Sequence, residues 1–342
     1  MTERNLNIKK FYHRVWFADE PLDLDKPTTS TFHGGQVAIT ANKIADFVHS
    51  VSNTSEAFVE KRGHEMLAPM DFAIVCGWAA ITKPLFVRAI DGDLLRLVHL
   101  SNGFRMIPGV PPLKKGDEVE TTAQINAILN QDAGKMVEVT ATLKRKKKPV
   151  MLVTSQFLYR GTYTDYENTF QRKDEIPMQV HLGSSKDVAV LRSKEWFNVD
   201  DLDREILNET LTFRLQTLTY YKNKSVFKSI QTLGEVLLEL PSKEVIQVAS
   251  VDYQAGESHG NPVIDYLQRY GSSIEQPVSF ENAIPLSGKT PLVLRAPASN
   301  ELYARVSGDY NPIHVSRVFS SYVDLQGLSH TACTRVPLSA VS

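Results

Sequence analysis

The residues that most constrain the fold form one apolar stretch, MLAPMDFAIVCGWAAITKPLF, at positions 66–86. It predicts a single helix, because Pro69 suits a first helical turn and Asp71 complements the positive end of the helix dipole. Pro84 is expected to end this helix. Apolar residues cover nearly every face of it, so other structure has to surround it. The fold is therefore expected to be built around a buried helix.

The residues after this helix are rich in strand patterns. Alternating apolar and polar residues in 137–161 predict a β-hairpin, whose turn is the basic run LKRKKKPV at 143–150. Residues 119–129 predict a further strand before the hairpin. This order indicates an α+β fold and agrees with the hot-dog arrangement, in which a curved antiparallel sheet wraps a central helix. Periodicity alone does not separate the hot dog from other α+β folds.

A second strand-rich block follows a polar linker at residues 163–177. Strand patterns recur at residues 210–223, 226–241 and 244–254, and a loop-rich passage comes after them. A last block opens near residue 284 with closely spaced Pro and Gly, which is typical of an irregular entry into a new unit. The chain therefore reads as two or three domains in 342 residues.

Charge excludes a dedicated nucleic-acid binder. The chain has 38 Lys and Arg against 39 Asp and Glu, a net charge of -1, whereas nucleic-acid binders concentrate a basic excess. The run at 143–150 is the one dense basic cluster, and two interpretations of it stay open. It is either a solvated hairpin tip or a docking patch for an acidic partner.

Cysteine content and the N-terminus indicate where the protein works. Cys76 and Cys333 lie far apart and lack metal-ligand spacing, so neither a disulfide framework nor a zinc site is expected. The N-terminal residues lack the pattern of a signal peptide. The most apolar run, 72–81, is far shorter than the roughly 20 residues that span a bilayer. We therefore expect a cytosolic protein that contacts neither membrane nor nucleic acid.

The strongest candidate chemistry lies in SGDYNPIHVSRVF, residues 307–319. Pro312 suits the first position of a helix, and Asn311 before it is then the N-cap. His314 falls in the first turn, where the positive helix end keeps the imidazole neutral and able to accept a proton. Asp309 can fold back towards the same side, so that the two groups share acid and base roles. The same residues also fit a well-capped helix start without catalytic function.

Other candidates carry weaker signals. His259 beside Glu257 fits a solvated loop pair, and His99 near Gly103 fits a structural histidine. The chain contains no GxxxxGK[ST] phosphate loop, no paired-glycine dinucleotide fingerprint after a strand, and no G-x-S-x-G nucleophile elbow.

Several long stretches resemble a known family. YARVSGDYNPIHVS resembles the signature of the (R)-specific enoyl hydratase and MaoC-like dehydratase family, which has the hot-dog fold. From about residue 10 to residue 330 the chain resembles the dehydratase region of fungal type I fatty acid synthase beta subunits. A primary synthase and a relative that feeds a polyketide pathway both stay open. The stretches that carry this resemblance include FHGGQVAITANKIADFVHSV, APMDFAIVCGWAAITKPLF, IDGDLLRLVHLSNGFRMIPG and EVIQVASVDYQAGESHGNPVIDYL.

The resemblance implies an α+β chain of tandem hot-dog folds, the last one truncated. It further implies that His314 and Asp309 are the catalytic pair, which Asn311 helps to position. The implied reaction dehydrates (R)-3-hydroxyacyl groups on an acyl carrier protein to trans-2-enoyl thioesters. No metal or organic cofactor is implied for this step, because the FMN and NADPH of a complete synthase belong to other domains. The implied partners are the acyl-carrier-protein domain and the alpha subunits.

The resemblance also implies five segments along the chain. They are the end of a preceding β-rich region at 1–28, a non-catalytic first hot-dog unit at 29–172, a second hot-dog-like or insert unit at 173–285, the start of the catalytic unit at 286–330, and an aberrant tail at 331–342.

The chain departs from the family after His330, where Gly, Met and Tyr are missing. Codons exist for Thr331 to Pro337 that, read in a shifted frame, encode Gly-Met-Tyr-Thr-Ser-Ala. This shifted reading restores the missing Gly, Met and Tyr, so we predict a frameshift or a gene-model error after His330. Without the helix that those residues begin, dehydration by this chain is expected to be impaired. The alternatives are a non-catalytic module that binds acyl chains or carrier protein, and a remnant without function.

Overall fold

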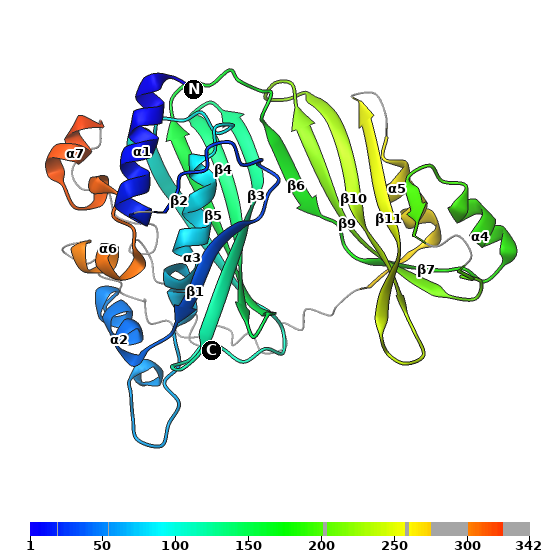
Figure 1. Ribbon diagram of the computed structural model, residues 1–342, viewed down its shortest axis with the longest axis horizontal. Coiled ribbons are helices and arrows are strands. Elements are labelled where there is room, and N and C mark those ends of the chain that lie inside the picture. The colour runs from blue at the N-terminus through cyan, green and yellow to red at the C-terminus, as the bar shows by residue number, and fades with distance from the viewer. Residues whose placement is uncertain (19, 54, 201–203, 257–259, 275–299, 324–342) are drawn as a thin grey trace, which may run out of the picture. The chain divides into compact units, whose positions relative to one another are not determined.

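The computed structural model describes residues 1–18, 20–53, 55–200, 204–256, 260–274 and 300–323 (Figure 1). Two compact units divide the chain, and we describe each by itself. The first comprises residues 1–164 together with 284–342, and the second comprises residues 165–283.

An antiparallel sheet forms the body of the first unit. Its strands pair in the order β1-β3-β4-β5-β2. The strands are β1 (Phe32–Ala38), β2 (Leu97–Met106), β3 (Glu118–Gln131), β4 (Gly134–Arg145) and β5 (Lys148–Arg160). The predicted hairpin is therefore confirmed as β4 and β5. Its two-residue turn places Lys146 at φ 51° and Lys147 at φ 65°, the left-handed conformation that tight hairpins need at both central positions.

The central helix, α3 (Ala73–Thr82), lies against β1, β3, β4 and β5 (Figure 1). Short 3-10 turns extend it at both ends, η2 (Met70–Phe72) and η3 (Lys83–Phe86). The buried helix is thus confirmed, although its predicted limits need two corrections. Residues 66–69 are not helical, because Leu67 forms a β-bridge with Lys114. Pro84 does not end the helical segment but lies at the start of the final 3-10 turn.

Small residues let the sheet approach this helix closely. A Cβ added to Gly34 of β1 would lie 2.9 Å from the backbone nitrogen of Ala80. A Cβ added to Gly77 of α3 would meet Ile81 at 3.2 Å and Leu143 of β4 at 3.7 Å. These contacts, together with the almost complete burial of α3, confirm the α+β hot-dog arrangement for this unit.

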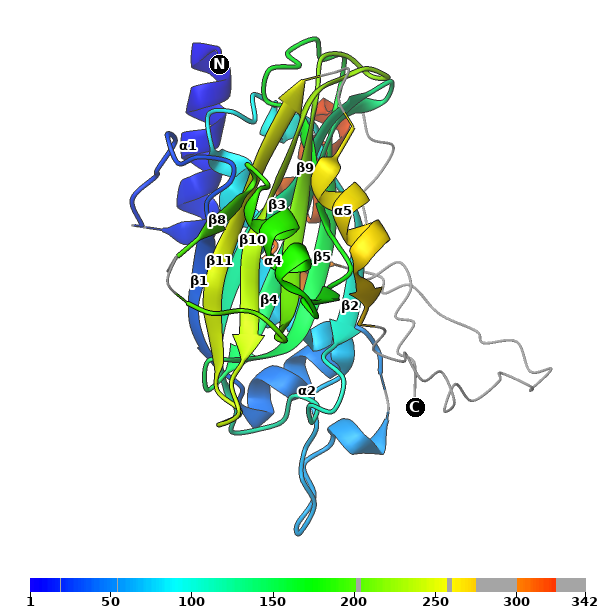
Figure 2. The same ribbon diagram turned by 90° about the vertical axis from the view of Figure 1, so that its right-hand side faces the viewer.

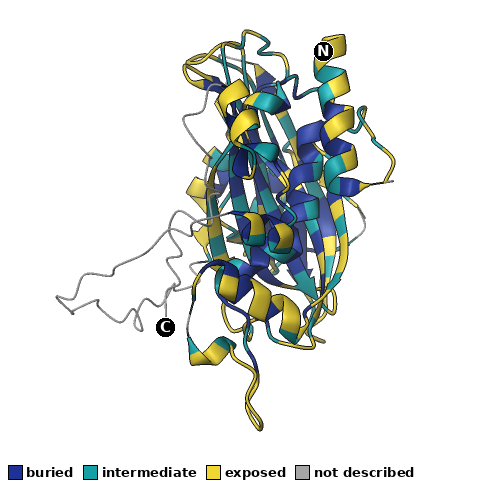
Figure 3. Ribbon diagram, turned by 90° about the vertical axis from the view of Figure 1, so that its left-hand side faces the viewer, coloured by how far each residue is buried: buried dark blue, intermediate teal, exposed yellow. Residues whose placement is uncertain are grey.

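The N-terminal residues contradict one prediction. We expected residues 1–28 to end a β-rich region, but Glu3–Phe17 form the helix α1. The side chain of Thr2 caps this helix, and Glu3 complements its positive end. Figure 3 shows buried residues on one side of α1 and exposed residues on the other.

A buried lysine attaches α1 to the segment after α3. Lys9 is fully buried, and its Nζ donates hydrogen bonds to the carbonyl oxygens of Leu85, Val87 and Ile90 at 3.2, 2.7 and 2.8 Å. Burial lowers the pKa of Lys9 to about 7. Three acceptors require the three hydrogens of an ammonium group, so these carbonyls offset the cost of burying the charge.

The remaining short elements of the first unit complete its outer layer. They are α2 (Ala41–Ser50), η1 (Glu56–Phe58), η4 (Leu94–Arg96), α6 (Glu301–Ser307), η5 (Pro312–His314) and α7 (Arg317–Tyr322).

The second unit is a separate antiparallel sheet. The three predicted strands are confirmed as β9 (Thr210–Tyr221), β10 (Phe227–Glu239) and β11 (Val245–Gly256), which pair in that order. Figure 2 shows α4 and α5 in front of these strands, and their apolar residues join the core of this unit. Its other elements are β6 (Phe170–Asp174), β7 (Met178–His181), α4 (Ser185–Arg192), β8 (Phe197–Val199), α5 (Pro262–Tyr270) and β12 (Ser272–Ser273).

The start of the central helix generates a prediction about pH. Burial raises the pKa of Asp71 from its usual 3.8 to about 6, and Oδ1 has no hydrogen-bond partner. The folded state therefore holds a proton more tightly than the unfolded chain does. Stability is lost as the pH rises from about 4 to 6, and the cost persists at neutral pH. Asp71→Asn should raise the free energy of unfolding by about 2 kcal/mol at pH 7.

Chemical denaturation at several pH values measures this difference. The gain from Asp71→Asn should be small by about pH 4 and disappear below about pH 3, where both states carry the protonated carboxyl group. The exposed Asp46 of α2 is the matched control, and Asp46→Asn should change stability little at any of these pH values. A loss of stability at pH 7 in Asp71→Asn would show that the carboxylate stabilises the helix.

Candidate active site

The three predicted site residues lie in the turn after α6 and in the short η5 that follows it. Gly308 ends α6 in the left-handed conformation at φ 81°, and its amide donates to the carbonyl oxygen of Ala304 at 2.9 Å. A Cβ at Gly308 would also lie 3.2 Å from Cδ1 of Trp78 on α3. Glycine is therefore required for both the positive φ and the close approach to the central helix.

The structure brings Asp309, Asn311 and His314 together. Nε2 of His314 lies 3.3 Å from Oδ2 of Asp309, and the backbone amide of Asn311 donates to Oδ1 of Asp309 at 3.4 Å. The three residues are only 3%, 5% and 2% exposed. A carboxyl group and an imidazole in contact inside the protein can exchange a proton with each other and with a bound molecule.

The predicted cap is confirmed, and the predicted helix after it is corrected. Oδ1 of Asn311 accepts from the amide of Ile313 at 3.4 Å, so Asn311 is the N-cap. The helix it caps is the single 3-10 turn η5. The chain then continues into α7, which begins at Arg317 with its own cap, Ser316. Ser316 offers a hydroxyl that competes for the free amides, which explains the interruption.

Contacts with other helices hold the turn in place. Nδ2 of Asn300 donates to the carbonyl oxygen of His314 at 3.1 Å, and the amide of Asp309 donates to Oγ of Ser307 at 3.2 Å. The ring of Tyr303 on α6 packs on Phe47 of α2, with ring centroids 6.2 Å apart. The turn therefore has packed neighbours on both α2 and α3.

Tyr12 of α1 is a site neighbour that the sequence did not suggest. It is completely buried, and its hydroxyl donates to Oδ1 of Asn311 at 3.3 Å. Burial raises the pKa of Tyr12, and the negative charges of Asp93 and Asp309 raise it further. A helix pattern in the first residues could have predicted that Tyr12 is buried. It could not have predicted the contact with Asn311, which lies 299 residues later in the chain.

His99 of β2 lies close enough to the pair for their charges to act on it. Burial lowers its pKa, the carboxylate of Asp309 opposes that shift, and His314 adds to it. Nε2 of His99 is 2.9 Å from Oδ1 of Asn102, and the ring stacks on Phe157 at 4.6 Å. These contacts agree with the structural role that the sequence suggested.

The remaining residues considered in the sequence lie outside the described residues or are buried. His259 and Glu257 lie outside the described residues, as do His330, Cys333 and the rest of the tail. Cys76 is a buried free thiol, and burial raises its pKa to about 12. Within the described ranges, no three His, Cys, Asp or Glu side chains come together as a metal site. No helix in those ranges is both long enough and apolar enough to cross a membrane.

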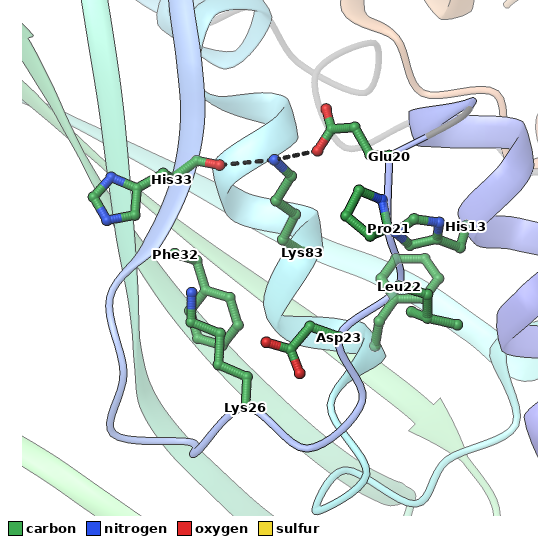
Figure 4. A pocket seen from close by; sticks show the side chains of 10 residues that line it. His13, Glu20, Pro21, Leu22, Asp23, Lys26, Phe32, His33 and Lys83 are labelled. Carbon is green, nitrogen blue, oxygen red and sulfur yellow. Dashed lines mark hydrogen bonds and ion pairs between the residues drawn. The ribbon is translucent and has the colours of Figure 1, made fainter.

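A separate pocket of about 240 Å³ lies beside η3 and β1 (Figure 4). Nζ of Lys83 is 2.7 Å from Oε2 of Glu20 and donates to the carbonyl oxygen of His33 at 2.8 Å. The residues that line it, among them His13 and Lys26, do not include Asp309, Asn311 or His314. We therefore assign it no part in the site.

Three family models match successive parts of this chain. They are "FAS1-like, dehydratase domain region" at residues 27–153, "Fatty acid synthase subunit beta, insertion domain" at 170–267, and "MaoC like domain" at 269–334. The MaoC-like match includes the turn with Asp309 and His314.

Curated relatives match almost the whole chain. The fatty acid synthase subunit beta of Saccharomyces cerevisiae is 53% identical over 327 residues, which are 96% of this chain and 16% of that protein. The corresponding subunit of Schizosaccharomyces pombe is 52% identical over 95% of this chain and 16% of its own length. The chain thus spans about 16% of the length of these relatives. Among solved structures, a MaoC-like dehydratase aligns with 67% of this chain and 99% of its own, with 9% identity and a TM-score of 0.34.

The hydroxyl of Tyr12 generates a testable prediction. Tyr12→Phe keeps the packed ring but leaves Asn311 with one hydrogen bond fewer, so the free energy of unfolding should fall by about 1 kcal/mol. Chemical denaturation measures this loss. Tyr310 of the same turn is the control, because it is exposed and its hydroxyl bond to Arg305 is 3.4 Å long. Equal effects of Tyr12→Phe and Tyr310→Phe would contradict a specific role for the buried hydroxyl.

Proposed function

Because this chain belongs to the family of fungal fatty acid synthase beta subunits, matching their dehydratase region, we propose that it dehydrates (R)-3-hydroxyacyl thioesters to trans-2-enoyl thioesters. The observation that carries the proposal is the buried contact of 3.3 Å between Asp309 and His314. The class of the reaction follows from the family, and the two groups match the chemistry that it needs.

The reaction removes a proton from C2 and a hydroxide from C3 of the acyl group. In our proposal neutral His314 takes the proton from C2, which the neighbouring thioester carbonyl makes acidic. Asp309 assists the departure of the C3 hydroxyl as water. As the C2–H and C3–O bonds break, a double bond forms between C2 and C3. The proton that His314 takes from C2 passes across its contact with Asp309 to the departing C3 hydroxyl, which leaves as water, so the pair returns to its starting state.

Burial of the pair supports this division of work. With 3–4% of their side-chain surface exposed, both groups lie where charge interactions are much stronger than in water. Asn311 contributes by position, since its amide binds Asp309 and its side chain is held by Ile313 and Tyr12. A fixed geometry of this kind reduces the reorganisation that the reaction needs.

The proposal extends to partners, cofactors and location. We propose that the substrate arrives on an acyl-carrier-protein domain and that the chain works in a multienzyme complex with alpha subunits. Proton transfer between carbon, carboxyl and imidazole needs neither a metal nor an organic cofactor, so we propose none for this step. We propose the cytosol as its location.

A second candidate function is that of a carrier-binding module without turnover. The observation that favours it is the exposed basic tip of the β4–β5 hairpin, Lys146, Lys147 and Lys148. A cluster of positive charge attracts an acidic protein surface. Carrier protein that binds in a salt-dependent manner, with no dehydration of its acyl group, would support this function over the first.

Replacing the histidine tests the dehydratase. In the intact protein, His314→Ala should lower kcat for a 3-hydroxyacyl thioester by about 10²–10⁴-fold, because it removes the base. Formation of the enoyl thioester, followed by its ultraviolet absorbance, measures the rate. The control is His181→Ala, an exposed histidine of β7 that should leave the rate unchanged. Turnover close to that of the unmodified protein would exclude His314 as the base.

A further inference from the structure

Trp78 has a buried donor without an acceptor. The residue lies on α3 and is 7% exposed, and its indole Nε1 has no hydrogen-bond partner in the part of the chain that the structure describes. Buried indole N–H groups usually find a partner, because leaving one unpaired costs about 1–3 kcal/mol. An exception of this kind in a close-packed helix needs an explanation.

The donor lies beside the turn that carries the proposed catalytic pair. From the position of a Cβ on Gly308, the indole Cδ1 is 3.2 Å away and Nε1 is 3.8 Å away. The N–H edge of Trp78 therefore faces the residue immediately before Asp309. The N–H thus lies next to the turn that leads directly into Asp309.

The aromatic neighbours of Trp78 do not offer an acceptor. The Trp16 ring lies edge-on with ring centroids 6.0 Å apart, and an indole has no acceptor nitrogen. The His99 ring centroid is 5.8 Å away, and its Nε2 is already engaged with Oδ1 of Asn102 at 2.9 Å. Asn102 also accepts from Oγ of Ser155 at 2.6 Å. Within the described residues this N–H is therefore left for an acceptor on a bound molecule.

We propose that Trp78 is a substrate-binding residue of the dehydratase site, and that its indole N–H donates a hydrogen bond to an oxygen at the reacting end of the 3-hydroxyacyl thioester. This inference rests on the proposed function. The reacting end offers two acceptors, the C3 hydroxyl and the thioester carbonyl. The indole stays neutral and keeps its proton, so it binds and orients the substrate without taking part in proton transfer.

The proposal gives the central helix α3 a direct role in the site. This helix, which carries Trp78, then contributes a polar contact to chemistry carried by a turn more than 200 residues later. A donor fixed in a packed helix is preorganised, since it needs no rearrangement when the substrate arrives.

Trp78→Phe tests the contact, because it removes the N–H and keeps an aromatic ring. In the intact protein, kcat/KM for a 3-hydroxyacyl thioester should fall on the order of 10-fold. Binding of a 3-hydroxyacyl thioester and of the saturated thioester of equal length then identifies the oxygen. Weaker binding of the hydroxyacyl compound alone assigns the C3 hydroxyl, and weaker binding of both assigns the carbonyl. The control is Trp196→Phe, a buried tryptophan of the second unit, which should leave both affinities unchanged.

A second measurement needs no stable variant. The chain has 3 tryptophans, so the indole N–H proton of Trp78 can be assigned by nuclear magnetic resonance. Saturating 3-hydroxyacyl thioester should move this resonance downfield, as a new hydrogen bond does. An unmoved resonance, or Trp78→Phe turnover equal to that of the unmodified protein, would overturn the role of Trp78. If Trp78 fails this test while His314→Ala is inactive in the same assay, the proposed dehydratase function still holds. If the unmodified protein itself shows no turnover, the proposed function fails first.

Discussion

Burial of the helix α3 is the constraint on which the first unit depends. The helix presents apolar residues on nearly all sides, so one packed neighbour is not enough to cover it. The strands β1, β3, β4 and β5 supply the remaining cover, and β1 reaches the helix backbone because Gly34 carries no side chain. A bulkier residue at Gly34 would separate β1 from the helix that it has to cover.

The same helix determines where the candidate site lies. The sheet covers one side of α3, and the turn at Gly308 packs on another, against Trp78. Since Asp309 follows Gly308 directly, the packing of Gly308 on Trp78 also fixes the position of the Asp309 carboxylate. The contact of α6 with α2, through Tyr303 and Phe47, fixes the helix that leads into the turn. Packing around α3 therefore determines the geometry of residues that follow this helix by more than 200 positions.

The sequence predicted those structural features that depend on neighbouring residues in the chain. The buried helix, the basic hairpin and the Asn311 cap each depend on neighbouring residues, and all three are present in the structure. The α1 helix was missed, because its apolar face is interrupted by Lys9, a charge that becomes acceptable only when three carbonyls surround it. Trp78 and Tyr12 were missed for a related reason, since their importance lies in contacts with a turn distant in sequence.

The two distant contacts act on the turn in different ways. Tyr12 shares the oxygen of Asn311 with the amide of Ile313, so α1 and η5 fix one side chain between them. Lys9 lies one helical turn before Tyr12 and binds the carbonyls that follow α3, so it sets the position of α1 relative to the central helix. The position of Asn311 therefore depends on α3 by two routes, directly through Gly308 and indirectly through α1. A site supported in this way keeps its carboxyl and imidazole in contact only while the first unit is folded around α3.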